Sequence, residues 1–349
     1  SKKFPWISYC DFRKWNSPVV NDYYVFTTPT FYILDEPSTG LHFSDIKMNK
    51  YYTSIASIGS SSADFRAATF YRNQWPTIGN SYQTIGLAVD YKMELDKNNL
   101  GFGLLMNRDV SGELGFTRLQ VDGVFAYHKR VSRYSFFSGG VQGGITQHKI
   151  DETKGEWQNQ YNGKEHDPSL PTGEPALFQP FLTYNLGAGI MWEYNNAQFN
   201  RYSMTMSKLN FGVSLYHFAE PALVYNGGEP EYTRVAFTAS TDIILKSGVS
   251  SISPSLLYQF KGKEKELVFG SLYTFIIREE SKYTGYYDRL DISFGAYYRL
   301  PSDAIIPAFN MHYNSFEFGL TYGANISPLI SASNSVGGIE FTLKYLLRN

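Results

Sequence analysis

Residues 339–347 read Ile339-Glu340-Phe341-Thr342-Leu343-Lys344-Tyr345-Leu346-Leu347, and this alternation decides the fold class. In an extended strand, Ile339, Phe341, Leu343, Tyr345 and Leu347 share one face, while Glu340, Thr342 and Lys344 share the other. Strands of membrane-spanning barrels turn an apolar face to lipid and a polar face to the lumen. We therefore expect this segment to cross a membrane as a strand.

The same pattern recurs along most of the chain in segments of about ten residues, which is the spacing typical of barrel strands. Turn residues such as Asp96-Lys97-Asn98-Asn99 and Lys261-Gly262-Lys263-Glu264 separate the segments. The sequence therefore predicts an all-β fold, a transmembrane antiparallel β-barrel of about fourteen strands. Besides the last strand, the predicted strands lie near 64–74, 83–92, 100–108, 114–129, 132–147, 182–194, 208–218, 233–246, 251–261, 265–277, 290–300, 304–313 and 315–323.

Composition agrees with a barrel. The chain has 28 Tyr, 26 Phe and 30 Gly, an enrichment that suits aromatic girdles at two membrane interfaces. Mean hydropathy is -0.29, as expected where apolar and polar residues alternate. No apolar run approaches the ~18 to 20 residues of a membrane-spanning helix. The net charge of -1 gives no basic field for nucleic acid, and a single cysteine excludes an intramolecular disulfide.

The first forty residues differ from the rest. Ser1-Lys2-Lys3-Phe4-Pro5 is not followed by an apolar stretch, so we interpret the chain as mature or truncated. Residues 28–35 resemble the strand after the cis-proline of thioredoxin-like domains, without a Cys-x-x-Cys pair. The predicted division is an unassigned segment at 1–40, a periplasmic or lumen-inserted lead-in at 41–63, and the barrel at 64–349.

Segment 149–181 is long, polar and interrupted by Pro168, Pro171, Pro175 and Pro180. Long connections in such barrels usually face outward. The segment is predicted to be an external loop or a plug, with an uncommitted solvated loop as the alternative.

The sequence predicts no catalytic residue, metal or cofactor. The six histidines show no pairing at catalytic spacing, and each is expected at a membrane interface or in a loop. Gly101-x-Gly103 and Gly139-Gly140-Val141-Gln142-Gly143-Gly144 lie within strand patterns, where glycine permits bends or leaves lumen space.

Charged residues on the predicted inner face are the candidate functional residues. They carry both signs and alternate with apolar neighbours, so they could form ion pairs that stiffen or plug the barrel. A water-filled lumen in which they are simply hydrated is the alternative. The candidates are Arg66, Arg72, Asp90, Lys92, Asp122, Arg299, Glu340 and Lys344.

From Leu41 onward the chain resembles the PorP/SprF family of Bacteroidota outer-membrane proteins of the type IX secretion and gliding machinery. The landmarks occur in order: His42-Phe43-Ser44-Asp45, Met48-Asn49, Tyr71-Arg72-Asn73-Gln74-Trp75-Pro76, Tyr82-Gln83-Thr84, Gly101-Phe102-Gly103 ahead of Asp109, Ser253-Pro254-Ser255, Tyr298-Arg299 and Gly337-Gly338-Ile339-Glu340-Phe341-Thr342-Leu343-Lys344-Tyr345.

The resemblance implies a barrel of the bacterial outer membrane that supports secretion or surface anchoring of a partner protein. The implied partners are an adhesin-like protein with a C-terminal sorting domain and other secretion components, periplasmic or lipoprotein, besides outer-membrane lipid. The alternative is a passive, porin-like channel for a small solute. A barrel hydrolase is a third class, and it would need one essential Ser or His.

Overall fold

The protein is described from a computed structural model. It covers residues 43–74, 76, 82–112, 114–151, 158–165, 167–171, 179–196, 205–223, 230–245, 249–278, 289–301, 304–326 and 336–348. Residues Ser1–Asp35 form a separate unit, and the thioredoxin-like fragment predicted there lies outside the described residues. None of the helices in these ranges is long and apolar enough to cross a membrane.

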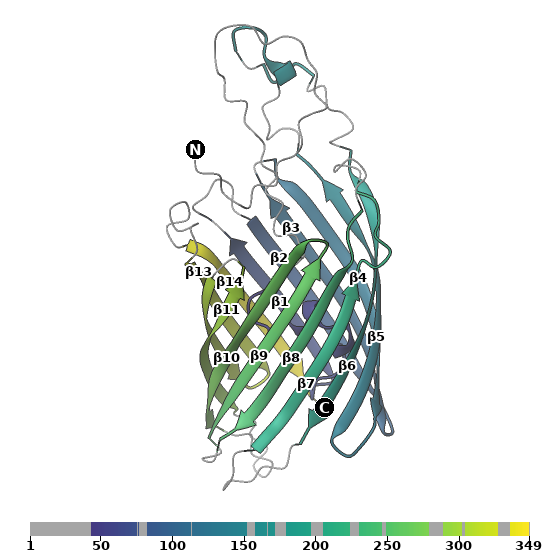
Figure 1. The fold of residues 1–349 in the computed structure, drawn as a ribbon, viewed down its shortest axis with the longest axis vertical. Helices are drawn as coiled ribbons and strands as arrows, with labels where there is room; N and C mark the ends of the chain where they lie inside the picture. Colours follow the sequence, from purple (N-terminus) through teal and green to yellow (C-terminus); the bar gives the residue numbers. More distant parts are fainter. Residues whose placement is uncertain are drawn as a thin grey trace. The chain divides into compact units, whose positions relative to one another are not determined.

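The described residues form a closed barrel of fourteen antiparallel strands, in which each strand pairs with its neighbours in sequence and β1 pairs with β14 (Figure 1). The predicted fold class is confirmed. The strands are β1 (Phe65–Gln74), β2 (Tyr82–Leu95), β3 (Asn98–Ser111), β4 (Phe116–Arg130), β5 (Ser135–Lys149), β6 (Phe181–Asn195), β7 (Thr205–Tyr216), β8 (Arg234–Ile244), β9 (Ser250–Lys261), β10 (Glu264–Arg278), β11 (Leu290–Leu300), β12 (Ala304–Tyr313), β13 (Phe316–Asn325) and β14 (Val336–Leu347).

The alternation in sequence becomes an alternation in exposure. On β2, Ile85, Leu87 and Tyr91 are 44–49% exposed, whereas the intervening Ala88 and Asp90 are buried. The outer wall is therefore apolar and the inner wall mixed, because the side chains of a strand point alternately to its two faces.

The two ends of the barrel differ. One end, here called the loop end, carries the connection 150–180 between β5 and β6 and the connection 217–233 between β7 and β8. The opposite end, the terminus end, is where β1 begins and β14 finishes, near the C-terminus (Figure 1). At the terminus end, β2 joins β3 through Asp96 and Lys97 alone, and β12 joins β13 through Asn314 and Ser315.

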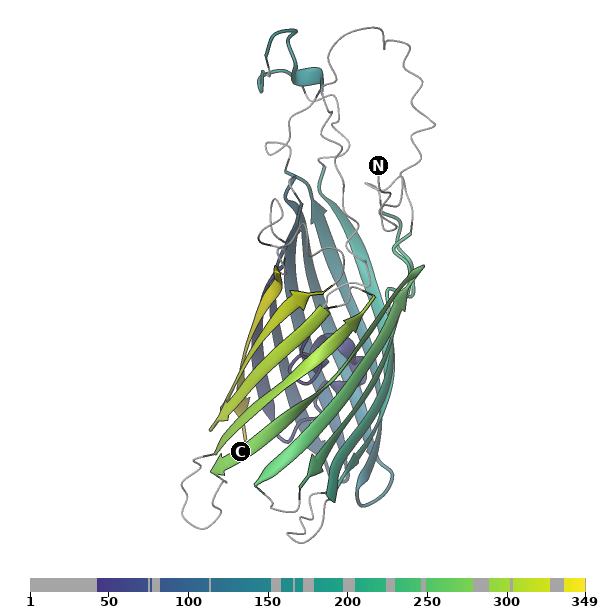
Figure 2. The ribbon, with the colours of Figure 1, turned by 60° about the vertical axis from the view of Figure 1, so that its left-hand side comes forward.

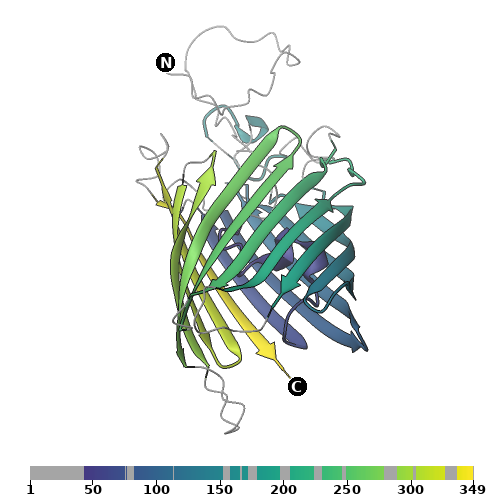
Figure 3. The ribbon, with the colours of Figure 1, turned by 60° about the horizontal axis from the view of Figure 1, so that its bottom comes forward.

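Residues 43–63, here called the lumen segment, precede β1 and lie inside the barrel. The segment contains the helical turns α1 (Lys50–Thr53) and η2 (Ile55–Ser57), and all of their side chains except that of Lys50 are buried. Figure 2 shows the segment in purple, enclosed by the strands, and Figure 3 shows it from a second direction. The barrel therefore encloses part of its own chain.

Candidate functional site in the barrel lumen

The first residues of the lumen segment are hydrogen-bonded to β11, β12 and β14. The backbone N and Oγ of Ser44 each donate a hydrogen bond of 2.8 Å to the carboxylate of Glu340 on β14. Arg299 on β11 donates to Ser44 Oγ at 2.7 Å. The next residue, Asp45, accepts hydrogen bonds from Tyr297 at 3.1 Å and Asn310 at 2.7 Å. Three strands thus hold two consecutive residues.

Later residues of the segment are hydrogen-bonded to β2, β3 and β7. The hydroxyl of Tyr52 donates to the carbonyl oxygens of Leu87 at 3.3 Å and Met106 at 3.2 Å, which places it against β2 and β3. Ile55 N donates to Ser214 Oγ on β7 at 3.1 Å. Farther on, Gly59 N donates to Asp90 at 2.7 Å.

Glycines on the inner wall make room for the segment. A Cβ on Gly101 of β3 would collide with the carbonyl oxygen of Ile58, and one on Gly103 would lie 2.9 Å from the Ile58 side chain. A Cβ on Gly140 of β5 would lie 3.1 Å from the carbonyl oxygen of Ile55, and one on Gly187 of β6 would lie 2.8 Å from the Ile55 side chain. Of the glycines predicted to permit bends or leave lumen space, Gly101, Gly103 and Gly140 lie against the lumen segment, whereas Gly139 and Gly143 do not.

The structure brings four of the eight candidate residues together as two pairs. Arg66 and Asp90 stand directly opposite on β1 and β2, and Arg66 Nε donates to Asp90 Oδ1 at 2.7 Å. Arg72 and Glu340 stand opposite on β1 and β14, 3.2 Å apart. Opposite charges at facing positions stabilise a strand pair, and here both pairs also border the lumen segment.

The other four candidates contact residues that were not predicted. Lys344 lies 3.3 Å from Glu317, and Arg299 lies 3.0 Å from Glu266. Lys92 lies 3.2 Å from Asp64 and 2.9 Å from Glu94, and Asp122 accepts hydrogen bonds from Gln120 and Asn185. No candidate side chain is fully solvated, but a functional role for the eight stays a prediction.

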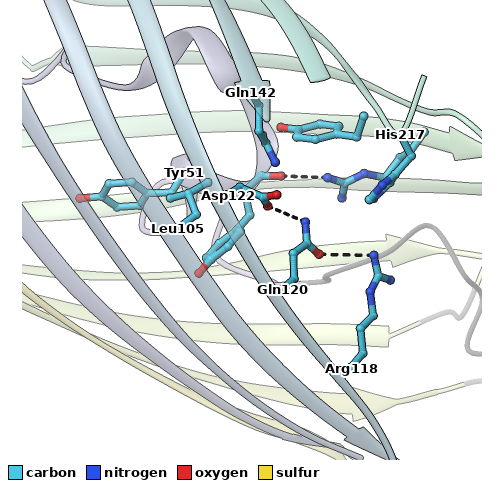
Figure 4. A pocket seen from close by; sticks show the side chains of 10 residues that line it. Tyr51, Leu105, Arg118, Gln120, Asp122, Gln142 and His217 are labelled. Carbon is cyan, nitrogen blue, oxygen red and sulfur yellow. Dashed lines mark hydrogen bonds between the residues drawn. The ribbon is translucent and has the colours of Figure 1, made fainter. Parts of the chain in front are cut away.

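A small cavity lies between the lumen segment and the walls of β4 and β8 (Figure 4). Along the β4 wall, Gln120 accepts from Arg118 at 3.3 Å and donates to Asp122 at 2.6 Å. The volume open to the centres of water-sized molecules is ≈ 20 Å³. The lining residues are Tyr51, Tyr52, Leu105, Arg118, Gln120, Asp122, Gln142, Tyr216, His217 and Arg234.

A charged cluster lies beside this cavity at the loop end. Glu231, in the connection between β7 and β8, lies 3.0 Å from Arg118, 3.3 Å from Lys261 and 3.7 Å from His217. Burial raises the pKa of the Glu231 carboxyl, but Arg118 and Lys261 outweigh burial and hold that pKa well below its usual range. Burial lowers the pKa of His217 to about 3, so the imidazole is neutral near pH 7.

Several of these residues were not predicted from the sequence. Arg118, Gln120 and Asp122 alternate along β4, which is the signal that placed Asp122 on the inner face and could have placed the other two. Glu231 has no such signal, because it precedes its strand. The expectation that every histidine lies at an interface or in a loop is wrong for His128 and His148, which are 2% exposed on inner-facing positions of β4 and β5.

Comparisons with known proteins give one family match. The profile of the family described as type IX secretion system membrane protein PorP/SprF matches residues 38–345. No curated protein matches the chain.

The chain is also similar to solved structures, at low identity. BamA from Haemophilus ducreyi lacking POTRA domains 1-3 is 9% identical, with a TM-score of 0.42 over 81% of this chain and 70% of that one. CdiB from Acinetobacter baumannii is 8% identical, with a TM-score of 0.41 over 82% and 60%. The CymD monoaromatic hydrocarbon channel is 11% identical, with a TM-score of 0.39 over 89% and 95%. At TM-scores this low, none of these likenesses points to a function.

Proposed function

The chain belongs to the PorP/SprF family of type IX secretion system membrane proteins, and we propose that its barrel holds a partner protein at the outer membrane and does not conduct solutes. The partner is a secreted or surface adhesin-like protein with a C-terminal sorting domain, or a periplasmic or lipoprotein component of the same machinery. Apolar side chains on the outer wall fix the barrel in outer-membrane lipid.

One observation carries the proposal: the lumen is occupied by residues 43–63 of the chain itself. The segment is bound at both of its ends and in its middle, and glycines shape the wall around it. A diffusion channel needs a water-filled path through the lumen, whereas a filled barrel is a rigid support. This arrangement favours docking over permeation.

The closed wall also favours a docking site on the loops and not on a strand edge. Each strand in the described part of the chain pairs on both sides, so no strand edge is left for a partner to extend. The loop end offers the connections 150–180 and 217–233, of which the first is the longest between any two strands. We therefore place the docking surface on the loops of that end.

Affinity purification from the native membrane in mild detergent tests this proposal. A tag in the Asp96–Lys97 turn leaves the loop end untouched, and mass spectrometry of the eluate should find a larger secreted protein or other secretion components. A matched variant in which a short Gly-Ser linker replaces 158–171 should keep the barrel and lose that partner. A barrel that repeatedly elutes alone would contradict the proposal.

Conductance in a planar bilayer separates docking from permeation. The wild-type barrel should show almost no current, because its lumen is occupied. A variant in which a Gly-Ser linker of equal length replaces residues 45–58 should conduct in those molecules that insert, which shows that the assay can detect an open barrel. A steady current from the wild-type protein, equal to that of the variant, would favour the channel.

A further inference from the structure

The cavity beside β8 contains a buried cation that lacks a carboxylate partner among the described residues. Arg234 is 6% exposed and lies in no ion pair within those residues. Its Nη2 donates to the carbonyl oxygen of Tyr52 at 3.3 Å, and its guanidinium lies 3.9 Å from the ring centroid of Tyr216. Its Nε and Nη1 are buried and have no hydrogen-bond partner. A guanidinium held in this way needs an acceptor, because a buried charge without one is costly.

The charges around the cavity identify the kind of acceptor. Arg118 and Lys261 share the Glu231 carboxylate, at 3.0 Å and 3.3 Å, whereas Nε and Nη1 of Arg234 have no hydrogen-bond partner. Asp122 lines the same cavity, so a dianion bound to Arg234 would face a carboxylate close by. A single negative charge beside Arg234 therefore fits better than a phosphate or sulfate.

The size and lining of the cavity narrow the ligand further. The volume open to the centres of water-sized molecules is ≈ 20 Å³, which is enough for about one water or one small anionic group. Gln120 lines the same cavity, but its Nε2 donates to Asp122, so the donors that remain for a ligand are Nε and Nη1 of Arg234. The planar donors of a guanidinium match the two oxygens of a carboxylate.

We propose that this cavity binds one monocarboxylate group, with Arg234 as its charge partner. The carboxylate belongs either to a small free acid or to the end of a polypeptide that enters from the loop end. The site is separate from the docking role: the carboxylate site can fail while co-purification of a partner succeeds, and the reverse also holds.

Thermal unfolding of the full-length barrel in detergent tests the site. The buffer has constant ionic strength and contains fluoride as its only other anion. Added sodium formate or acetate should raise Tm by about 3 °C, and the rise should reach a plateau with increasing concentration. Arg234→Met should lose this response, and Arg130→Met, which removes an exposed arginine, should keep it. The electrophoretic shift between unheated and boiled samples checks that each variant is folded.

Further ligands identify the source of the carboxylate and test whether a halide or an ordered water satisfies Arg234 instead. A rise in Tm with triglycine but not with triglycine amide would support the site and identify the end of a polypeptide as the source of the carboxylate. A response to formate and acetate alone would support it with a free acid as the source. An equal response to chloride, or no saturable response in the wild type, would overturn the proposal, since a halide or ordered water would then satisfy Arg234.

If Arg234→Met fails to fold, Arg234→Lys with wild-type controls replaces it. A lysine keeps the charge but loses Nε and the planar donors. Acetate affinity weakened at least tenfold in this variant would support the site, and unchanged affinity would overturn the role of Arg234.

Discussion

Single residues on the inner wall decide whether the lumen segment fits. Gly101 faces inward against Ile58, whereas Gly139 on β5 has no atom within 4 Å of where its Cβ would lie. The same substitution at these two positions therefore separates the effect of crowding the lumen from the general effect of replacing glycine in a strand.

Gly101→Ala should destabilise the barrel by about 1–3 kcal/mol, because the new methyl group meets backbone that has little room to shift. Gly139→Ala should change stability by less than about 0.5 kcal/mol. Urea unfolding followed by tryptophan fluorescence measures both. Equal effects of the two substitutions would mean that the lumen segment does not press against β3.

The Arg72–Glu340 pair gives a second test at this scale. Both side chains are less than 10% exposed, and Glu340 also holds Ser44. Arg72→Met leaves a buried carboxylate and should cost about 3–5 kcal/mol. Adding Glu340→Gln to Arg72→Met should recover part of that loss, and Arg133→Met, at an exposed position, serves as the control. Strictly additive effects would exclude a coupled pair.

Alternation in the sequence assigns a side chain to one face of a strand, but it cannot identify the partner of that side chain. Alternation on β1, β2 and β14 places Arg66, Asp90 and Glu340 inward, but it says nothing of register. The register sets Arg66 opposite Asp90 and Arg72 opposite Glu340, and it depends on which strands are neighbours. Pairing across the β1–β14 closure joins residues far apart in the chain, which a local pattern cannot show.

At the scale of an element, the β7–β8 connection should respond to acid. His217 is buried and neutral, with its pKa lowered to about 3, while an unfolded histidine titrates near 6.5. The unfolded chain therefore binds an extra proton between about pH 6.5 and 3, and stability falls as the pH falls through that window. Glu231 acts in the same direction at lower pH, because its pKa is also lowered.

His217→Asn should flatten this dependence by up to ~1.4 kcal/mol per pH unit below pH 6. Asparagine suits the positive φ of +55° at this position. Urea midpoints of the wild type and of His217→Asn at pH 7.5 and 4.5 measure the effect. If wild type and His217→Asn lose stability equally on acidification, His217 is not the group that titrates.

The lumen segment is the element that the sequence described least well. It lacks alternation, and its two helical turns are short, four residues in α1 and three in η2, so no periodicity could predict them. Its position follows from the barrel around it, since its polar groups find partners on strands from β2 to β14. The inward glycines were the available signal, and they indicated space without indicating its occupant.

For the whole molecule, the number of strands was predictable because each strand repeats the same two-faced pattern. Several boundaries also agree closely, such as 290–300 for β11 and 304–313 for β12. The division into three domains stays a prediction. The structure adds the asymmetry of the two ends, which gives the barrel a proposed direction in the membrane.

An epitope inserted at Gly163, in the connection between β5 and β6, should bind antibody on intact cells, because long connections of outer-membrane barrels face outward. The same epitope inserted at Lys97, at the terminus end, should bind only after the outer membrane is permeabilised. Labelling at Lys97 but not Gly163 on intact cells would reverse the direction assigned to the barrel.

The position of the lumen segment also constrains the order in which the molecule is built. Residues 43–63 precede every strand, yet fourteen strands surround them. Protein chains rarely thread themselves through a ring that has already closed. We therefore expect the segment to be in place before the ring of strands closes, so that it acts as an internal template for closure. A chain shortened within this segment would then be impaired in insertion as well as altered once inserted.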